Sequence, residues 1–472
     1  MRGFCFYVGH NMETKAVILA AGKGTRMRSS LPKVLHPIGG QSMLGRVIDT
    51  ARAVCGSAPV VVYGHAGERL RAQFAKEPID WAEQREQLGT GHAVMQAVPY
   101  LNDNARVLIL YGDVPLLRAE TLRDLLDATP SDGAAILTML LEDPTGYGRV
   151  VRGSDDTIAA IIEHKDADAA TRAIREVNTG IMLLPAAALK GWLANLSNDN
   201  AQGEYYLTDV VAIGRADGIP FRSVVVADPG EVAGVNDRVQ QAAIERLYQR
   251  RCAEALMRGG VTLADPERIE IRGVLECGED VFIDVGCVFE GHVRLAAGVC
   301  IGPNCVIKDA EIGPGTHVEA MVCVDGAKVG PDAHVGPFAR VRPGCNLAPG
   351  VRLGNFVEVK NAQIGEGSKV NHLSYVGDTV MGAHVNVGAG TITCNYDGAY
   401  KHQTIIGDGV FIGSDTQLVA PVTVGAGATI AAGTTVTKDV PAGGLTIGRT
   451  RQHHLSAWRR PAKTNIKTNT EA

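Results

Sequence analysis

The stretch that decides the fold runs from residue 301 to residue 335 and reads IGPNCVIKDAEIGPGTHVEAMVCVDGAKVGPDAHV. Aliphatic residues recur in it at every fifth or sixth position, namely at Ile301, Ile307, Ile312, Val318, Val324, Val329 and Val335. A helix repeats every ~3.6 residues and a flat strand every two, so neither explains this spacing. A parallel β-helix does, because each repeat forms one side of a triangular coil whose aliphatic residue points inward.

The same spacing continues on both sides of this stretch, over residues 283–387 and again over 406–436. Of the 56 glycines, 30 lie within residues 273–448, and glycine suits the corners of such coils. A run of β-hairpins would need Asn-Gly or Asp-Gly turns between alternating strands, and these are rare here. The sequence therefore predicts a parallel β-helix in the second half of the chain.

One long interruption separates Val387 from Ile406 and reads GAGTITCNYDGAYKHQT. Residues that do not stack in a coil must project from it as a loop. Such loops carry function more often than the repeat does, although a loop can also merely cover an edge. Both interpretations stay open on the residues alone.

Composition excludes several classes of protein. The chain has 472 residues, enough for two to four domains, and 45% are hydrophobic, which excludes a disordered chain. The net charge of −5 argues against a general nucleic-acid binder. No apolar run reaches about 18 residues and the N-terminus lacks a secretion signal, so neither a membrane span nor export is expected. The ten cysteines form no C-x-x-C motif, and we expect a cytoplasmic protein.

The first half contains an apolar strand, KAVILAAG at residues 15–22, whose last glycine opens the segment GKGTRM at residues 22–27. Glycines after a strand let backbone N–H groups approach phosphates closely. The motif is neither G-x-G-x-x-G nor a Walker A loop. Arg26 and Lys33 could both reach a triphosphate, although a glycine-rich turn alone is weak evidence for phosphate binding.

A second apolar strand, RVLILYGD at residues 106–113, ends in Gly112 and Asp113. Ligands of open α/β sheets bind outside the carboxyl ends of the strands. Asp113 is therefore a candidate ligand for Mg²⁺, and the alternative is a cap on the next helix. QLGTGHA, PTGYGRV and EVNTGIM are glycine-rich turns suited to a base or to sugar hydroxyls, and each could also be a plain turn.

The motifs of both halves resemble one known family. LAAGKGTRM, LPK, QLGTGHA, YGDVPL, PTGYGR, IIEHKDA and NTGI are similar to bacterial UDP-N-acetylglucosamine pyrophosphorylases. RVRPG, GNFVEVK, NHLSYVGD, NVGAGTITCNYDG and GSDTQLVAPVTVG resemble the glucosamine-1-phosphate N-acetyltransferase domain of the same bifunctional family. The resemblance runs from Met12 to about Lys463, and residues 1–11 are assigned no role.

The resemblance implies an α/β, Rossmann-like nucleotidyltransferase domain at residues 12–235 and a linker helix at 236–260. A left-handed parallel β-helix of hexapeptide repeats, the acetyltransferase domain, would follow at 261–463. It implies acetyl transfer from acetyl-CoA to glucosamine 1-phosphate, then uridylyl transfer from UTP, with Mg²⁺ at the second site. The product would serve peptidoglycan and lipopolysaccharide synthesis. The family is trimeric, so we expect a homotrimer with acetyl sites shared between chains and no nucleic-acid or membrane partner.

The resemblance also assigns residues to the uridylyl site. The nucleotide would be bound by Leu19, Ala20, Ala21, Gly22, Lys33, Gln84, Gly89 and Thr90, and we add Arg26 for the leaving pyrophosphate. The sugar phosphate would be bound by Tyr111, Gly112, Gly148, Glu163, Asn178 and Asn236. Mg²⁺ would be held by Asp113 and Asn236.

For the acetyl site, the resemblance implies His372 as the general base, since an imidazole with a reference pKa of about 6.5 is largely neutral at pH 7. Glucosamine 1-phosphate would be bound by Arg342, Lys360, Tyr375 and Asn386. Acetyl-CoA would be bound by Ala389, Asn395, Tyr396, Ser414, Ala432 and Arg449. Asn395 and Tyr396 lie in the predicted projecting loop.

Two other hypotheses remain. In one, only the pyrophosphorylase is active and the β-helix is an oligomerisation scaffold. The other is a β-helix metalloenzyme that uses histidines such as His292, His317, His334 or His384.

Overall fold

The computed structural model describes residues 13–64, 67–130, 132–154 and 156–460. Contacts divide the chain into two compact units, one reaching to Leu275 and including Val288–His292, the other comprising Glu276–Cys287 and the chain from Val293 onward. The predicted limits at residues 12 and 461–463, like residues 1–11, lie outside the described residues. In the described part, no helix is long and apolar enough to cross a membrane.

A mixed, mainly parallel sheet forms the centre of the first unit, with the strand order β11-β7-β10-β6-β1-β4-β5. Strand β10 runs antiparallel to β6 and β7, while β1 is parallel to both of its neighbours. The path consists of β1 (Thr14–Ala20), β4 (Val60–Tyr63), β5 (Asp80–Glu83), β6 (Arg106–Tyr111), β7 (Ala134–Leu140), β10 (Glu176–Pro185) and β11 (Phe221–Val225), and the outlying strands are β8 (Arg149–Arg152) and β9 (Ile158–Ile162). A separate hairpin joins β2 (Pro37–Ile38) and β3 (Gln41–Ser42).

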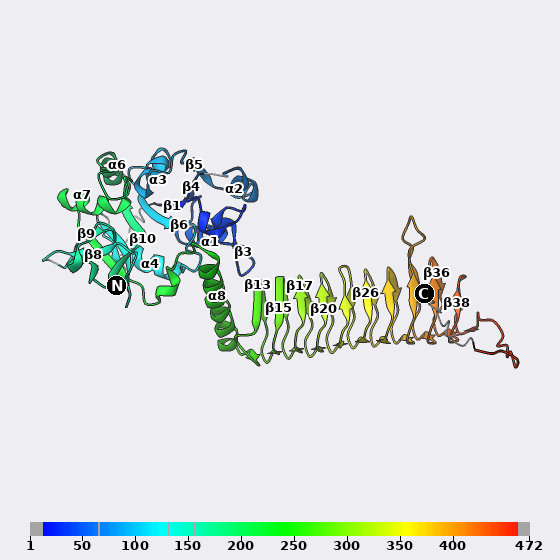
Figure 1. Cartoon of the computed structure of the whole chain (residues 1–472). Helices are drawn as coiled ribbons and strands as arrows, with labels where there is room; N and C mark the ends of the chain where they lie inside the picture. Colours follow the sequence, from blue (N-terminus) through cyan, green and yellow to red (C-terminus); the bar gives the residue numbers. More distant parts are fainter. Residues whose placement is uncertain (1–12, 65–66, 131, 155, 461–472) are drawn as a thin grey trace, which may run out of the picture. The chain divides into compact units, whose positions relative to one another are not determined.

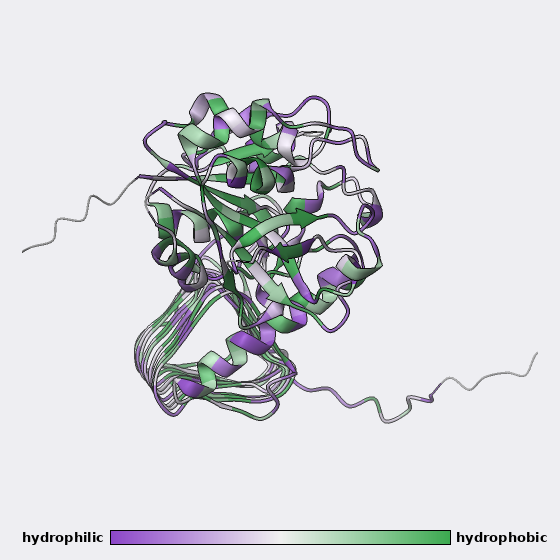
Figure 2. Ribbon diagram, turned by 90° about the vertical axis from the view of Figure 1, so that its left-hand side faces the viewer, coloured by the Kyte–Doolittle hydropathy of each residue, from purple (hydrophilic) through white to green (hydrophobic). Residues whose placement is uncertain are grey.

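Helices cover both faces of this sheet, because alternate residues of each buried strand point to opposite sides. In β1, Val17 and Leu19 pack into one core cluster, while Ala16 and Ile18 pack into another. Figure 2 shows these strands as predominantly hydrophobic. The helices are α1 (Met43–Cys55), α2 (Gly67–Gln73), α3 (Thr90–Ala97), α4 (Ala119–Ala128), α5 (Ala169–Arg172), α6 (Ala186–Ala194), α7 (Val210–Ala216) and α8 (Arg238–Arg258). The Rossmann-like α/β fold class expected from the sequence is confirmed.

Residues 262–446 form a parallel β-helix, visible in Figure 1 as a row of stacked strands and in Figure 2 as superimposed three-sided coils. One sheet stacks a single strand from each coil, and a second sheet of seventeen strands takes the rest. The first sheet contains β12 (Thr262–Leu263), β14 (Phe282–Ile283), β16 (Cys300–Ile301), β19 (His317–Val318), β22 (His334–Val335), β25 (Arg352–Asn355), β28 (Lys369–His372), β31 (Asn386–Val387), β34 (Phe411–Ile412), β37 (Thr429–Ile430) and β39 (Leu445–Thr446).

The second sheet continues around the other sides of the coils. Its strands are β13 (Ile269–Cys277), β15 (Cys287–Leu295), β17 (Val306–Lys308), β18 (Glu311–Ile312), β20 (Cys323–Asp325), β21 (Lys328–Val329), β23 (Arg340–Val341), β24 (Asn346–Leu347), β26 (Glu358–Lys360), β27 (Gln363–Ile364), β29 (Tyr375–Gly377), β30 (Thr379–Met381), β32 (Ile392–Cys394), β33 (Thr404–Ile406), β35 (Gln417–Val419), β36 (Val422–Val424) and β38 (Thr435–Val436).

The periodic aliphatic residues form the interior of the coils, as predicted. Ile301 pairs in register with Val318, and Val318 pairs with Val335. All three are at most 2% exposed. The five- or six-residue spacing is therefore the side of one coil, and stacking of its inward residue makes the core.

The predicted interruption is shorter than the sequence indicated. Thr393 in β32 pairs with Leu418 and is buried, and Thr404 in β33 is buried as well. Two threonines thus occupy inward positions that a search for aliphatic residues does not recognise. Only residues 395–403 project from the coil, in a hairpin closed by an antiparallel bridge between Tyr396 and Lys401 (Figure 1).

Candidate functional site

A cavity of about 240 Å³ lies at the carboxyl ends of β1 and β6 in the first unit. Leu19 pairs with Tyr111 in register, so the two glycine-containing strand ends meet at one edge of the sheet. The cavity is lined by Leu19, Ala20, Ala21, Gly22, Lys33, Val34, Gln84, Gln87, Gly89, Thr90, Ala93, Tyr111, Asp113 and Glu204. All the residues predicted to bind the nucleotide, except Arg26, are therefore brought to one place.

A glycine turn closes the cavity on the side of Gln84. Gly89 has a φ of 109°, and a Cβ there would lie 2.6 Å from the carbonyl oxygen of Tyr205, so only glycine fits. Gln84 is 3% exposed, and its Nε2 donates to the carbonyl oxygen of Gly89 at 3.1 Å. The Thr90 hydroxyl accepts a hydrogen bond from the N–H of Leu207 at 3.1 Å. Hydrogen bonds to the Gln84 side chain and to the backbone of Leu207 thus fix the turn predicted to contact the base.

Asp113 and Asn236 converge on a single cation. The Lys33 ammonium donates to Asp113 Oδ2 at 2.5 Å and to Asn236 Oδ1 at 3.2 Å. The N–H of Val235 donates to the carbonyl oxygen of Asp113 at 3.0 Å and places Asn236 beside it. Two hard oxygen donors that share one cation fit Mg²⁺, which takes its other ligands from water and substrate phosphates.

The predicted sugar-phosphate residues form a neighbouring cluster. The N–H of Asn178 donates to the carbonyl oxygen of Gly148 at 2.9 Å, and a Cβ at Gly148 would lie 3.3 Å from Glu163 Oε1. Thr208 Oγ1 donates to the same Glu163 oxygen at 3.2 Å. Burial raises the pKa of Glu163, and the nearby Asp166 and Asp209 carboxylates add to the effect.

Tyr111 connects this cluster with the nucleotide cavity. A Cβ on Gly180 would lie 2.4 Å from the Tyr111 ring, so the ring packs against bare glycine backbone. Burial raises the pKa of Tyr111, and the Glu163 and Asp113 carboxylates raise it further. Since both carboxylates act on one phenol, the sugar cluster and the metal pair both lie near Tyr111.

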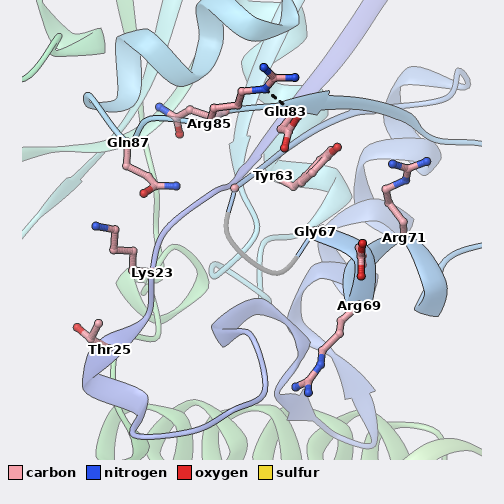
Figure 3. Close-up of a pocket in the computed structure, with 12 residues that line it drawn as sticks. Lys23, Thr25, Tyr63, Gly67, Arg69, Arg71, Glu83, Arg85 and Gln87 are labelled. Atoms are coloured by element: carbon pink, nitrogen blue, oxygen red, sulfur yellow. Dashed lines mark hydrogen bonds and ion pairs between the residues drawn. The ribbon is translucent and has the colours of Figure 1, made fainter.

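A second cavity of about 1040 Å³ shares Gln84 and Gln87 with the first. Lys23 and Thr25 lie on one side of it and Arg69 and Arg71 on the other (Figure 3). Arg26, which we expected at the leaving pyrophosphate, is exposed and lines neither cavity.

In the second unit, His372 ends strand β28, and its ring is oriented by a neighbouring coil. Asn355 in β25 pairs with His372 in register, and Asn355 Oδ1 lies 2.9 Å from His372 Nδ1. The amide oxygen is an acceptor, so Nδ1 carries the proton and Nε2 keeps its lone pair. An exposed imidazole with a free Nε2 can remove a proton from an amine.

Cations gather beside this histidine on the next face of the coil. Arg342 donates to Glu358 Oε1 at 2.8 Å, and Glu358 pairs with Tyr375 in register. The pKa of Lys360 is lowered, chiefly by the Lys401 ammonium and further by Arg342. Lys401 therefore reaches from the projecting hairpin to the predicted phosphate-binding pair.

A second contact fixes the base of this hairpin. Asn395 Nδ2 donates to Asp378 Oδ2 at 2.6 Å and lies 3.5 Å from the Tyr375 hydroxyl. The hydroxyl of Tyr396, further along, is bonded to the carbonyl oxygen of Gly398. Asn386 lies on β31, in register with Lys369 of the strand that carries His372.

Four of the six predicted acetyl-CoA residues form a column along successive coils. The N–H of Asp415 donates to the carbonyl oxygen of Ala389, and the N–H of Gly433 donates to that of Ser414. Arg449 Nη1 donates to the carbonyl oxygen of Ala432 at 2.6 Å. Ala389, Ser414, Ala432 and Arg449 therefore follow one another along the prism, as an extended ligand requires.

Sequence reasoning missed several residues of these sites. Asn355 and Lys401 were not singled out, although both lie within motifs that were quoted. Thr208 and Glu204 were missed because they belong to a segment without glycine-rich motifs. A search for polar residues one coil before each candidate base would have found Asn355, since coils stack about every 17 residues.

The metalloenzyme hypothesis has no support in the described residues, where no group of three or more His, Cys, Asp or Glu side chains is placed to hold a metal. His317 and His334 stack with ring centroids 6.3 Å apart, and His334 lies 3.3 Å from Glu319.

Family models match parts of both units. A family model for a MobA-like NTP transferase domain matches residues 16–258, and a bacterial transferase hexapeptide model of six repeats matches residues 403–438. Among solved structures, a UDP-glucose pyrophosphorylase complexed with UDP-glucose matches with a TM-score of 0.42 at 14% identity, covering 51% of this chain and 100% of that one.

Full-length relatives are much more similar. "Bifunctional protein GlmU" of Cupriavidus pinatubonensis is 57% identical over 447 residues, which cover 95% of this chain and 98% of the relative. The protein of the same name from Alkalilimnicola ehrlichii is 58% identical over 447 residues, covering 95% of this chain and 96% of the relative. This chain therefore belongs to the GlmU family of bifunctional proteins.

Proposed function

We propose that the chain converts glucosamine 1-phosphate into UDP-N-acetylglucosamine in two steps. The β-helix transfers an acetyl group from acetyl-CoA to the sugar amine, and the α/β unit transfers a uridylyl group from UTP to the sugar phosphate. One observation carries the proposal. The nucleotide-binding candidates surround one cavity of the first unit, while the acetyl-transfer candidates lie on neighbouring coils of the second.

In uridylyl transfer, a phosphate oxygen of N-acetylglucosamine 1-phosphate attacks the α-phosphorus of UTP, and pyrophosphate leaves. The protein's task is to position two anions and to neutralise their charge. Lys33 supplies a cation beside the phosphates, and Glu163 and Asn178 orient the sugar. Asp113 and Asn236 would hold Mg²⁺, which, when bound, neutralises charge on both substrates.

In acetyl transfer, the amine of glucosamine 1-phosphate attacks the thioester carbon, and coenzyme A leaves as the thiol. His372 Nε2 takes the proton of the attacking amine, and the hydrogen bond from Nδ1 to Asn355 stabilises the imidazolium that forms. Arg342 and Lys360 bind the sugar phosphate. The column from Ala389 to Arg449 holds acetyl-CoA along the prism.

The oligomer that we propose is a homotrimer, and an exposed apolar column supports it. Met321, Phe338, Phe356 and Leu373 are 50%, 46%, 55% and 60% exposed and occupy corresponding corners of successive coils with positive φ. The rings of Phe338 and Phe356 stack with centroids 5.4 Å apart. Contiguous exposed apolar side chains mark contact surfaces, and Leu373 follows the candidate base His372 directly.

The oligomer has its own test. Sedimentation equilibrium should give three chains per particle. Phe356→Glu should dissociate the particle and lower acetyl transfer, while uridylyl transfer by the separate chains remains. A monomeric parent protein would refute the trimer.

The proposed function is tested with the full chain supplied with UTP, acetyl-CoA and glucosamine 1-phosphate. Leaving out acetyl-CoA should stop UDP-sugar formation, and N-acetylglucosamine 1-phosphate should restore it. Leaving out UTP should leave thiol release intact. Absence of thiol release would leave only the pyrophosphorylase, with the β-helix as a scaffold. The cytoplasmic location stays a prediction that cell fractionation would check.

A further inference from the structure

His92, on helix α3, contacts the side chain that is expected to read the base. Its Nδ1 lies 3.1 Å from Nε2 of Gln84, and its Nε2 lies 3.2 Å from Nε2 of Gln96. The ring also lies against Tyr205, with centroids 6.4 Å apart and planes tilted by 35°. The imidazole is therefore held from three sides, and the nucleotide mechanism above gives it no role.

The orientation of the Gln84 amide follows from its two neighbours. The carbonyl oxygen of Gly89 can only accept, so the amide group 3.1 Å away must be the NH₂ of Gln84. The same NH₂ faces His92 Nδ1, which must then accept too. A reversed amide would place its oxygen against the carbonyl oxygen of Gly89 and leave a buried NH₂ without these partners, which is unfavourable.

This arrangement fixes the protons of the ring. A neutral imidazole has one accepting and one donating nitrogen, so Nδ1 accepts and Nε2 carries the hydrogen. Gln96 Nε2 faces His92 Nε2 and also donates to the backbone carbonyl oxygen of His92 at 3.1 Å, so its oxygen reaches the ring only when that bond is given up. Gln96 is half-buried, where water can replace the lost partner, whereas the Gln84 side chain is only 3% exposed. The buried Gln84 therefore decides the tautomer.

With its NH₂ occupied twice, Gln84 has only its oxygen left for a ligand. No hydrogen bond to Gln84 Oε1 is found within the described ranges 13–64, 67–130, 132–154 and 156–460, and the residue lines the nucleotide cavity. The N3 atom of uracil carries a hydrogen and donates, whereas N3 of cytosine accepts. An oxygen at this position therefore suits uracil and repels cytosine.

We infer that His92 is a positioning residue for base selection, because its Nδ1 adds a second acceptor to the carbonyl oxygen of Gly89, and the two together hold the Gln84 amide with its oxygen toward the base and so favour UTP over CTP. The inference rests on the proposed function, in which Gln84 reads the uracil. It predicts a change in the ratio of kcat/KM for UTP to kcat/KM for CTP. A merely structural role for His92 would not change this ratio.

The test compares kcat/KM for UTP with that for CTP, using N-acetylglucosamine 1-phosphate as the acceptor. His92→Leu removes the acceptor and should lower the UTP-to-CTP ratio by about tenfold, the effect of about one hydrogen bond. His92→Asn places an amide oxygen near the position of Nδ1 and should keep the ratio within about threefold of the parent protein. Acetyl transfer should be unchanged in both variants.

Three outcomes decide the matter. An unchanged ratio in His92→Leu, with both substrates slowed equally, would show a structural role and overturn the inference. A ratio in His92→Asn as low as in His92→Leu would also overturn it, because the restored acceptor would then have no effect. Gln84→Leu tests base reading by Gln84 separately from the role of His92. An unchanged UTP-to-CTP ratio in this variant would refute base reading by Gln84, and with it the inference about His92.

Discussion

Asn355 Oδ1 lies 2.9 Å from His372 Nδ1, on strands β25 and β28 that stack in register. The contact leaves Nε2 of the histidine as the only ring atom free to take a proton. The two residues are 17 positions apart in sequence, which is one turn of the coil. The reactive tautomer is thus set by the stacking of the scaffold.

Replacing His372 separates the two activities. We expect His372→Ala to slow acetyl transfer by roughly 10²–10⁴-fold, the usual contribution of a general base. Uridylyl transfer from N-acetylglucosamine 1-phosphate should stay at the parent level, since it takes place in the other unit. Loss of both activities in a folded variant would contradict the assignment of two separate sites.

Replacing Asn355 tests the tautomer. Asn355→Leu removes the acceptor at Nδ1, so both tautomers become populated and the imidazolium loses its partner. The kcat of acetyl transfer should fall roughly tenfold while KM for glucosamine 1-phosphate changes little, since Asn355 acts through His372. Asn355→Asp, which keeps an acceptor, should retain most of the activity. Equal losses in the two variants would show that packing matters here, not hydrogen bonding.

Replacing Asp113 should have the opposite selectivity to replacing His372. Asp113→Ala removes one of the two oxygens that would hold Mg²⁺ and leaves Lys33 with Asn236 alone. Uridylyl transfer should fall by at least roughly 10²-fold, and the magnesium concentration needed for half-maximal rate should rise. Thiol release from acetyl-CoA serves as the internal control and should be unaffected.

Lys401 should contribute to binding of the sugar phosphate at the acetyl site. Lys401→Met removes one of three neighbouring cations, so KM for glucosamine 1-phosphate should rise about tenfold. The same substitution at the exposed Lys438 controls for loss of charge alone. Lys401 also lowers the pKa of Lys360, so in the parent protein Lys360 loses its proton at a lower pH than an ordinary lysine. The alkaline fall in kcat/KM should therefore move to higher pH in the variant.

Protonation of Glu163 should reduce uridylyl transfer at acidic pH. Its raised pKa means that it is protonated at pH values where a carboxyl with the usual value of 4.5 is still ionised. On acidification, kcat/KM for N-acetylglucosamine 1-phosphate should thus begin to fall above pH 4.5, because this ratio reports the free enzyme. Glu163→Gln should lower kcat/KM at every pH and abolish this fall on the acidic side of the pH profile. A fall that persists unchanged in the variant would belong to another group.

The sequence predicts the β-helix well because each inward residue packs mainly on its equivalents in the adjacent coils, which lie a fixed number of residues away. Val318 needs only its equivalents one coil before and one coil after, so a local spacing is enough to place it. The strand ends of the first unit are predictable for a related reason, since Leu19 and Tyr111 each close an apolar run before a glycine-containing turn. Long-range contacts without such a period are harder to foresee.

The contacts that hold the sites illustrate this limit. Leu207 binds Thr90 across 117 positions, and Thr208 binds Glu163 across 45. Neither Leu207 nor Thr208 belongs to a motif, so only the fold brings them to the site. The expectation for Arg26 rested on its place beside the glycine-rich loop, and the structure leaves its side chain on the surface.

The hairpin of residues 395–403 leaves and rejoins the prism between two buried threonines, Thr393 and Thr404. The strands on both sides of the hairpin, β32 and β33, therefore keep their parallel pairing with the neighbouring coils despite the insertion. An inserted loop of this kind can be lengthened, or its residues changed, at a free-energy cost of little more than its loop-closure entropy. New acceptor specificities could consequently be introduced at residues 396–403 without changing Asn395 or the stacked strands of the β-helix.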